Sequence, residues 1–224
     1  MPYEIKALPK ETFPKTKYSK SLPQPVAGAF RVAMCGCSGS GKTTATIRMI
    51  QEMRPEFRRI IVWAPDISQY KRNLKKMMNR HDKLIEGYSD ESLKEEYGKQ
   101  MARMRAKKPM IKTLFVLDDC IQAVQKSPYF EELNVVSRKS RVSLIYVFHK
   151  FTSASPIARA NMTHLCLFST SHMELSLVCR YLGLEYEKLK NAYDESRAKE
   201  RFRFVYVSCN PAAVFESFSD KRLL

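Results

Sequence analysis

Short apolar runs alternate along this chain with longer segments of mixed polarity. Six of the runs are rich in β-branched and aromatic residues and predict strands. They lie at residues 29–35, 58–65, 113–119, 142–148, 163–169 and 201–209. Strands that are nearly continuous in apolar residues are typical of parallel sheets whose two faces are both covered. The pattern therefore predicts an α/β fold with a mainly parallel sheet and helices on both faces.

Helices are expected between these strands, where the segments are more polar and apolar positions recur at helical spacing. The expected helices are residues 42–53, 71–85, 91–108, 174–183 and 186–193. Residues 1–25 hold prolines and lysines with little periodicity, so an extended arm is expected there. Residues 26–224 are expected to form a single domain, with a basic helical insertion at about residues 66–110.

The stretch GCSGSGKTT stands between the first expected strand and the first expected helix. It matches the pattern G-x-x-x-x-G-K-[ST], in which glycines let backbone N–H groups turn inward around a phosphate. We expect Lys42 to reach the β- and γ-phosphates of ATP and the Thr43 hydroxyl to bind Mg²⁺. The alternative is a chance turn. The nucleotide-binding residues expected here are Gly36, Cys37, Ser38, Gly39, Ser40, Gly41, Lys42, Thr43 and Thr44.

A pair of acids follows a later apolar run, in the sequence LFVLDD. The two carboxylates fall at the carboxyl end of an expected buried strand, at the edge where the first strand delivers the glycine-rich loop. This is a Walker B pattern. We expect Asp118 to bind Mg²⁺ and Asp119 to orient or deprotonate the attacking water. The alternative is that a strand-ending aspartate simply caps the next helix.

The charge balance changes the picture, because 39 Lys and Arg against 23 Asp and Glu give a net charge of +16 and an isoelectric point near 9.6. Such an excess favours polyanions, since neutralised phosphates release counterions. Residues 71–112 alone hold 13 basic residues against 6 acidic ones, and we expect them to contact DNA phosphates. The alternative is a basic surface that only keeps the protein soluble.

Three classes of protein are disfavoured by composition. Apolar runs are shorter than a membrane span needs, and the first residues lack the apolar core of a signal peptide, so a soluble, unsecreted protein is expected. The six cysteines form no C-x-x-C pairs, which favours reduced thiols over disulfides or a zinc site.

Taken in order, GCSGSGKT, LFVLDD, VSRKSRVSLIYVFHKF and PIARANMTHLCLFS resemble the motifs of the genome-packaging ATPases of double-jelly-roll DNA viruses. That family includes the poxvirus type and belongs to the FtsK-HerA superfamily of P-loop NTPases. The resemblance runs from Phe30 to about Thr170. It implies a RecA/FtsK-HerA-like domain that forms rings and translocates double-stranded DNA.

The resemblance also implies further site residues. In the superfamily an arginine finger precedes the strand after Walker B, and here that position falls on Arg138, the first choice, or Arg141. The same strand typically ends in a glutamine that senses the γ-phosphate, whereas this chain has His149. A neutral histidine can still donate one hydrogen bond there, and a structural role is the alternative. Arg159 and Asn161 match the pattern before the next strand, with packing, a subunit contact or catalysis left open.

The resemblance therefore implies an ATP-driven translocase that packages viral double-stranded DNA into a preformed capsid. Its implied cofactors are ATP and Mg²⁺. Its implied partners are double-stranded DNA, further copies of the chain in a pentameric or hexameric ring, and capsid vertex proteins, with no membrane span. It would work inside the host cell, in the cytoplasm or nucleus at assembly sites, or together with the virion.

Two other functions are weighed against this one. A P-loop nucleotide or small-molecule kinase has a similar size and the same loop, but a nucleoside does not require a net charge of +16. A nucleic-acid-binding module without turnover is hard to reconcile with Asp118 and Asp119 behind a complete Lys42 and Thr43. The packaging ATPase is the preferred interpretation.

Overall fold

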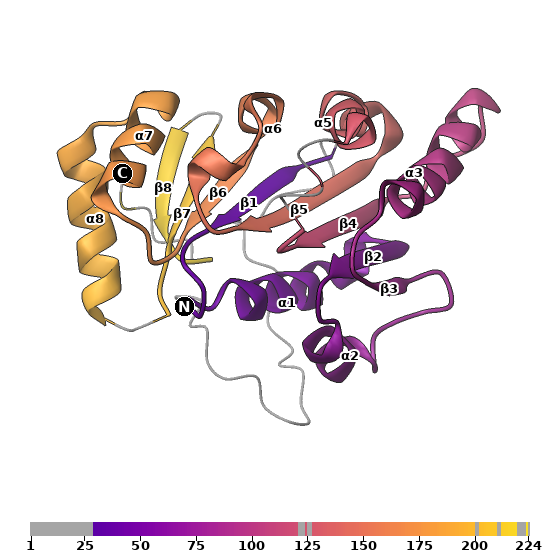
Figure 1. Cartoon of the computed structure of the whole chain (residues 1–224), viewed down its shortest axis with the longest axis horizontal. Coiled ribbons are helices and arrows are strands. Elements are labelled where there is room, and N and C mark those ends of the chain that lie inside the picture. Colours follow the sequence, from indigo (N-terminus) through magenta and orange to yellow (C-terminus); the bar gives the residue numbers. More distant parts are fainter. Residues whose placement is uncertain are drawn as a thin grey trace.

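A computed structural model describes residues 29–120, 124, 127–199, 202–209, 212–218 and 223. They form one eight-stranded sheet with the strand order β3-β2-β4-β5-β1-β6-β7-β8 (Figure 1). All pairs from β3 to β6 are parallel, and β7 and β8 add antiparallel strands at one edge. The strands are β1 Arg31–Cys35, β2 Arg59–Ala64, β3 Lys83–Glu86, β4 Thr113–Asp118, β5 Val142–Phe148, β6 His164–Leu167, β7 Val205–Cys209 and β8 Ala212–Glu216.

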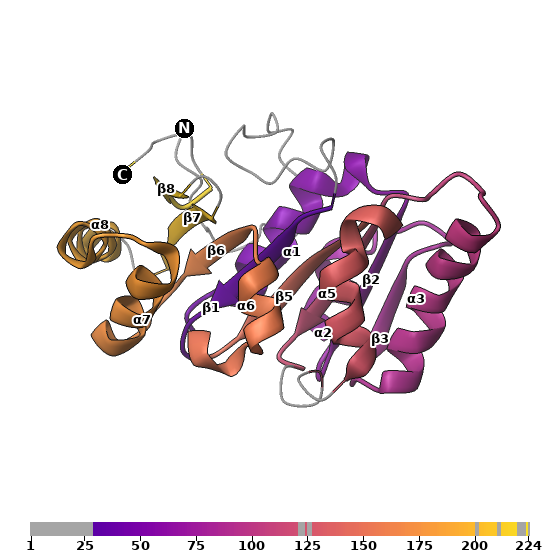
Figure 2. The ribbon, with the colours of Figure 1, turned by 90° about the horizontal axis from the view of Figure 1, so that it is seen from above.

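Helices cover both faces of this sheet, which gives three layers (Figure 2). The helices are α1 Lys42–Met53, η2 Arg54–Glu56, α2 Ser68–Leu74, α3 Asp90–Arg105, α5 Pro128–Ser140, η3 Phe151–Ser153, α6 Pro156–Asn161, α7 His172–Leu182 and α8 Tyr186–Lys199. Helices α1 and α2 lie on one face, and α3, α5, α6, α7 and α8 lie on the other (Figure 1). The expected α/β fold, with a mainly parallel sheet between helical layers, is confirmed.

The apolar residues of the central strands divide between the two faces because successive side chains in a strand point in opposite directions. On the α1 and α2 side, Met34 and Val116 pack with Ile50. On the other side, Phe115 and Tyr146 pack with residues of α3, α5 and α6. The central strands are thus buried on both sides, which explains their nearly continuous apolar sequences.

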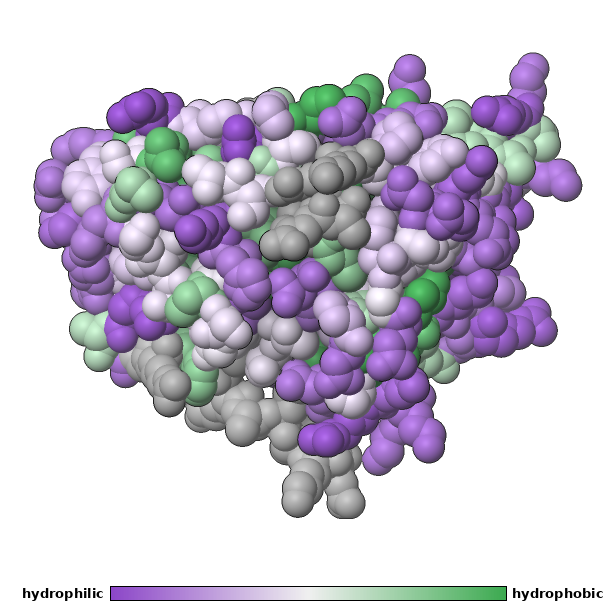
Figure 3. Space-filling view, viewed as in Figure 1, coloured by the Kyte–Doolittle hydropathy of each residue, from purple (hydrophilic) through white to green (hydrophobic). Residues whose placement is uncertain are grey.

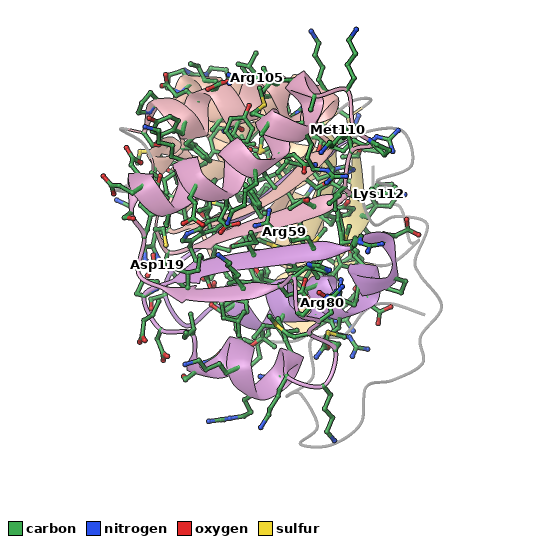
Figure 4. The ribbon with its side chains drawn as sticks, turned by 90° about the vertical axis from the view of Figure 1, so that its right-hand side faces the viewer. Arg59, Arg80, Arg105, Met110, Lys112 and Asp119 are labelled. Atoms are coloured by element: carbon green, nitrogen blue, oxygen red, sulfur yellow. The ribbon has the colours of Figure 1, made fainter. Side chains whose placement is uncertain are left out.

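Strands β4, β5 and β1 are neighbours, and their register brings three loops to one edge of the sheet. Cys35 pairs with Phe148, and Asp118 pairs with Val147. The phosphate loop, residue 149 and residue 119 therefore start at almost the same level. Figure 4 shows Asp119 at one end of the strands and Lys112, which precedes β4, at the other.

One expected helix was wrong in its second half. The sequence predicted a helix over residues 71–85, but α2 ends at Leu74 and residues 83–86 form strand β3. Asp82 explains the change, because its carboxylate accepts hydrogen bonds from the backbone N–H of Ile60 (2.7 Å) and of Asn79 (2.7 Å) and from Arg54 (2.9 Å). These contacts hold the chain in a turn that starts β3 beside β2.

Helices α5 and α6 and strand β8 were not predicted. Strand β7 was predicted, but it begins at Val205 rather than at residue 201. The insertion expected at about residues 66–110 contains α2 and α3 but also β3, which extends the sheet. The arm expected at residues 1–25 lies outside the described residues.

Candidate active site

The phosphate loop takes backbone conformations that explain its glycines. Gly39 has φ +70° and Gly41, which caps α1, has φ +95°, a region that side chains with a Cβ rarely adopt. The first turn of α1 contains no acidic residue, so the free N–H groups and the positive end of this 12-residue helix face the loop without a competing carboxylate. The loop is therefore suited to an anion.

Lys42 holds its ammonium group inside the loop. The Nζ atom donates to the carbonyl oxygens of Gly36 (2.6 Å) and Cys37 (2.7 Å). Burial lowers the pKa of Lys42, and the charges of Asp118 and Asp119 act in the opposite direction. Since an ammonium group has three donors, one remains for a phosphate oxygen.

Gly36 anchors the start of the loop between two strands. Its N–H donates to the carbonyl of Phe148 (3.2 Å), and the N–H of Cys37 donates to the carbonyl of Ser169 (2.8 Å). A Cβ atom on Gly36 would lie 2.6 Å from the Cβ of Phe168 and 3.1 Å from the Ser169 oxygen. No side chain fits there, so the glycine is required by packing as well as by backbone conformation.

Asp118 is the last residue of β4, and its carboxylate contacts one residue in each of two helices, α1 and α2. Its Oδ2 atom accepts hydrogen bonds from the Thr43 hydroxyl (3.0 Å) and from the Tyr70 hydroxyl (2.6 Å). Burial raises the pKa of Asp118, while the hydrogen bonds from Tyr70 and Thr43 lower it. The carboxylate is thus both buried and fixed in orientation.

These residues fit Mg²⁺, which prefers hard oxygen ligands and keeps several waters. The Thr43 hydroxyl gives its proton to Asp118, so its lone pairs remain for a cation. Among the described residues, both hydrogen bonds that Asp118 accepts fall on Oδ2. The other carboxylate oxygen is therefore available to a cation or to a metal-bound water.

Asp119 and His149 form a second polar pair at the same edge. The distance from His149 Nε2 to Asp119 Oδ1 is 3.0 Å, and both side chains are about half exposed. Asp119 has φ +53°, in the left-handed region that aspartate and asparagine tolerate better than most residues. This conformation turns Asp119 away from the direction of β4. The carboxylates of Asp118 and Asp119 therefore lie at different places in the site and have different partners.

A cavity of about 320 Å³ lies over the loop and joins these parts. Loop residues line it together with Asp118, Asp119 and His149, which the sequence had suggested for the site, and with Gln69 and Phe202, which it had not. Gln69 lies in α2, just after β2, whose carboxyl end is at the same sheet edge. That position was the available signal. Phe202 lies against Gly41 and had no signal, because the chain returns to the loop from far along the sequence.

Arg141, one of the two candidates for the arginine finger, lies away from this cavity. Arg141 is exposed, has φ +52° and precedes β5; its carbonyl accepts from Thr113 N (3.1 Å), at the amino end of β4. It is thus at the sheet edge opposite the phosphate loop. Arg138 belongs to α5, and its side chain lies outside the described part.

Arg159 and Asn161 have structural contacts in α6. The Arg159 guanidinium donates to the carbonyl of Ala154 (2.7 Å) and stacks over the Phe151 ring (5.8 Å to its centroid). The Asn161 side-chain amide donates to the Ile157 carbonyl (3.0 Å), and the backbone carbonyl of Asn161 accepts a hydrogen bond from the Arg31 guanidinium. Of the alternatives left open for these residues, the contacts agree with packing.

This fold and this site define a P-loop ATPase. The chain belongs to the poxvirus A32 protein family, whose model matches residues 18–214. The resemblance to viral packaging ATPases is thereby confirmed at the level of the family. None of the curated proteins matches the chain in sequence.

Several solved structures share the fold. One is B204, the DNA-packaging ATPase from Sulfolobus turreted icosahedral virus, with TM-score 0.64, 14% identity and coverage of 86% of this chain and 98% of that one. Another is the genome packaging NTPase B204 from Sulfolobus turreted icosahedral virus 2 in complex with AMPPCP, with TM-score 0.64, 14% identity and coverage of 87% and 98%. The cytoplasmic domain of the Thermomonospora curvata type VII secretion ATPase EccC has TM-score 0.59 and 14% identity, and the match covers 86% of this chain and 27% of that domain.

Gly36→Ala is expected to destabilise the protein by about 1–3 kcal/mol, because the added methyl group overlaps the Cβ of Phe168. Urea unfolding of the nucleotide-free protein measures this directly. Gly39→Ala is the matched control, since no atom lies within 4 Å of its added Cβ and only the positive φ is strained. Equal unfolding free energies for wild type and Gly36→Ala would contradict the close packing at this position.

Replacing the two acids one at a time should separate their roles. Asp118→Asn is expected to weaken the Mg²⁺-dependent part of nucleotide binding, because a neutral amide is a poorer metal ligand. Asp119→Asn should bind Mg²⁺ and nucleotide normally but lose turnover, and asparagine tolerates the left-handed backbone there. Titration calorimetry with a non-hydrolysable ATP analogue, with and without Mg²⁺, distinguishes them. Equal Mg²⁺-dependent affinities in both variants would contradict this assignment.

Proposed function

We propose that this chain is an ATPase that uses ATP hydrolysis to drive double-stranded viral DNA into a preformed capsid. The observation that carries the proposal is the 3.0 Å hydrogen bond between Thr43, in the phosphate loop, and Asp118, at the end of β4. This hydrogen bond brings the phosphate loop and the acid expected to bind Mg²⁺ into one site. The chain that carries this site belongs to the poxvirus A32 family. The similar fold of B204, which is described as a DNA-packaging ATPase, supports the same function.

In this proposal the loop residues from Gly36 to Thr44 hold the phosphates of ATP. Lys42 directs its remaining N–H donor at the β- and γ-phosphates, and Thr43 and Asp118 hold Mg²⁺. When bound there, Mg²⁺ supplies positive charge that offsets the negative charge on the transferring phosphoryl group. The complexes of B204 with AMPPCP and ATP-gammaS support nucleotide binding by this fold.

Asp119 has the role of orienting or deprotonating the attacking water. It lies next to the metal-side acid and lines the same cavity, and its partner His149 is 3.0 Å away. The histidine lies where it can orient this carboxylate, and it follows β5, where the resemblance implies a residue that senses the γ-phosphate. Gln69, which also lines the cavity, is a second amide that can donate a hydrogen bond to a phosphate or to the water.

The partners in this proposal are DNA, copies of the same chain and the capsid. The net charge of +16 supports a polyanionic substrate, and hydrophilic residues cover the side made by α2, β3 and α3 (Figure 3). A ring of five or six copies would surround the duplex and dock on capsid vertex proteins in the host cytoplasm or nucleus. Within the described residues, no helix is long and apolar enough to cross a membrane.

A ring also explains the position of the arginines. Arg141 lies at the edge of the sheet opposite its own phosphate loop, so it cannot serve the nucleotide of its own subunit. In a ring, each interface joins two different surfaces of neighbouring subunits, and in this proposal the end of the sheet that carries Arg141 faces the phosphate loop of the neighbour. Arg138 or Arg141 would then stabilise the charge on the neighbour's transferring phosphoryl group.

The direct test of the function is ATP hydrolysis by the purified chain with and without double-stranded DNA. We expect Mg²⁺-dependent hydrolysis that duplex DNA stimulates, and we expect Lys42→Ala to abolish it while the thermal unfolding curve stays cooperative. The lysine holds a ligand rather than the core, so the fold should survive its loss. Hydrolysis that is insensitive to DNA would point to a kinase, and normal hydrolysis by Lys42→Ala would place the site elsewhere.

Mixing two inactive variants tests the arginine in trans. Arg138→Ala or Arg141→Ala should lower turnover by ~10³ to 10⁵ without a comparable loss of ATP affinity, because a finger acts on the transition state. Lys42→Ala is inactive for a different reason. Mixed rings contain interfaces that pair an intact nucleotide site with an intact arginine, so activity should return on mixing.

Each variant alone provides a control. A second control is Lys42→Ala mixed with a chain that carries Lys42→Ala, Arg138→Ala and Arg141→Ala together, because that mixture contains no intact nucleotide site. Native mass spectrometry of the mixtures verifies that rings contain both variants. If assembled mixed rings stay inactive for both arginines, the finger is another residue or acts within its own subunit.

A further inference from the structure

Helix α2 connects the metal-side acid to an exposed basic surface. Its inner face consists of Tyr70 and Leu74, which are both buried. Its outer side and the turn that follows it carry four exposed cations, Lys71, Arg72, Lys75 and Lys76. Lys75 and Lys76 follow Arg72 by three and four residues, so these three lie on one side of the helical path. Helix α2 thus has one face that is buried against the site, and another that presents basic residues to solvent.

Tyr70 attaches this helix directly to the site. Its side chain has 0% exposure, and its hydroxyl donates to Asp118 Oδ2 at 2.6 Å, shorter than the 3.0 Å hydrogen bond from Thr43 to the same oxygen. The pair joins residues 48 positions apart. Hydrogen bonds to a carboxylate are roughly twice as strong as neutral ones. The orientation of Asp118 and the position of α2 are therefore set together.

The residue before Tyr70 strengthens this connection. Gln69 is exposed and lines the nucleotide cavity, whereas Tyr70 reaches the acid beneath it. Helix α2 also contacts α1, where Gln51 Nε2 donates to the Asn73 carbonyl (3.3 Å). A ligand at the phosphate loop can therefore affect α2 in two ways. It can contact Gln69, which lines the cavity, and it can contact Asp118, which accepts the hydrogen bond from Tyr70.

We propose that Tyr70 is a positioning residue for the metal-binding carboxylate of Asp118. Through α2, binding of nucleotide then changes the affinity of Arg72, Lys75 and Lys76 for DNA phosphates. The proposal rests on the proposed function. A metal ion bound to the other oxygen of Asp118 stabilises the same orientation of the carboxylate that the Tyr70 hydroxyl holds, so binding at the nucleotide site also stabilises the position of α2. Since coupling between two binding sites is reciprocal, DNA on α2 also strengthens binding of Mg²⁺ and nucleotide.

The basic residues at the end of α3 provide an internal comparison. Arg105, Lys107 and Lys108 are exposed as well, but they follow a helix that covers the other face of the sheet. None of them belongs to an element that touches Asp118. They are therefore expected to add to DNA affinity without responding to the nucleotide.

The decisive experiment measures the dissociation constant for a labelled DNA duplex by fluorescence anisotropy, with and without Mg²⁺ and a non-hydrolysable ATP analogue. In wild type we expect the nucleotide to tighten DNA binding at least about 5-fold, in the usual range of allosteric coupling. In Tyr70→Phe the nucleotide effect should fall close to 1-fold, while DNA affinity without nucleotide is unchanged. Phenylalanine keeps the ring in its buried place and removes only the hydroxyl.

Tyr146→Phe is the matched control. Tyr146 is also fully buried, and its hydroxyl donates to the Ala158 carbonyl (3.2 Å) on the other face of the sheet. This variant loses a buried tyrosine hydrogen bond that has no connection to Asp118. It should keep the nucleotide effect on DNA binding, so a loss of coupling in Tyr70→Phe alone cannot be ascribed to general destabilisation.

Metal binding gives a second readout. Electron paramagnetic resonance of Mn²⁺ with the ATP analogue should show about 10-fold or greater weakening of Mn²⁺ affinity in Tyr70→Phe, as is typical when a partner of a metal ligand is removed. Tyr146→Phe should match wild type. Equal Mn²⁺ affinity in wild type and Tyr70→Phe would overturn the positioning role.

Charge variants test the other end of the helix, and do so even if Tyr70→Phe unfolds. Arg72→Gln, Lys75→Gln and Lys76→Gln together should abolish the nucleotide effect on DNA affinity, whereas Arg105→Gln, Lys107→Gln and Lys108→Gln together should weaken DNA binding equally with and without nucleotide. The opposite pattern, or a wild type whose DNA affinity ignores nucleotide, would overturn the coupling. Failure of wild type to bind DNA or hydrolyse ATP would instead reject the proposed function itself.

Discussion

The site depends on three adjacent parallel strands that end at the same level. Strands β4, β5 and β1 are held in register by their backbone hydrogen bonds, with Asp118 beside Val147 and Phe148 beside Cys35. The loops that leave them therefore start side by side at the same end of the sheet. Gly36 makes this possible, because any Cβ at that position would collide with the chain leaving β6. A backbone constraint thus places the charged groups, and their chemistry follows from the placement.

Much of this arrangement could be predicted from local sequence. The phosphate loop and helix α1 were found because glycine spacing and helical periodicity are local signals, and the bounds of α1 agree with the expected residues 42–53. Asp118 followed from a short apolar run that ends in an acid. Strand β3 could not be predicted, since the turn before it depends on Asp82 accepting from Ile60, 22 residues earlier. Contacts of that kind have no signature within a sequence window.

The residues that were missed reached the site through long-range contacts. Tyr70 stands in an ordinary polar helix, and nothing in its neighbours indicates an acid 48 residues away. For Gln69 the only signal was its position just after β2. His149 was expected as a substitute sensor, but the structure also gives it a partner, Asp119. The basic segment was expected to act as one DNA-binding region; its helices α2 and α3 instead lie on opposite faces of the sheet. Of these two helices, only α2 contacts Asp118, so the two parts of the basic segment are not expected to have the same function.

The most direct measurement is a cryo-EM structure of the assembled chain with duplex DNA, Mg²⁺ and a non-hydrolysable ATP analogue. We predict a closed ring with the triphosphate against Lys42 and Thr43. We also predict that the end of the next subunit's sheet that carries Arg138 or Arg141 faces that nucleotide, and that α2 contacts the DNA backbone. A nucleotide bound away from the loop that begins at Gly36, or a ring in which the opposite ends of neighbouring sheets do not meet, would contradict these predictions.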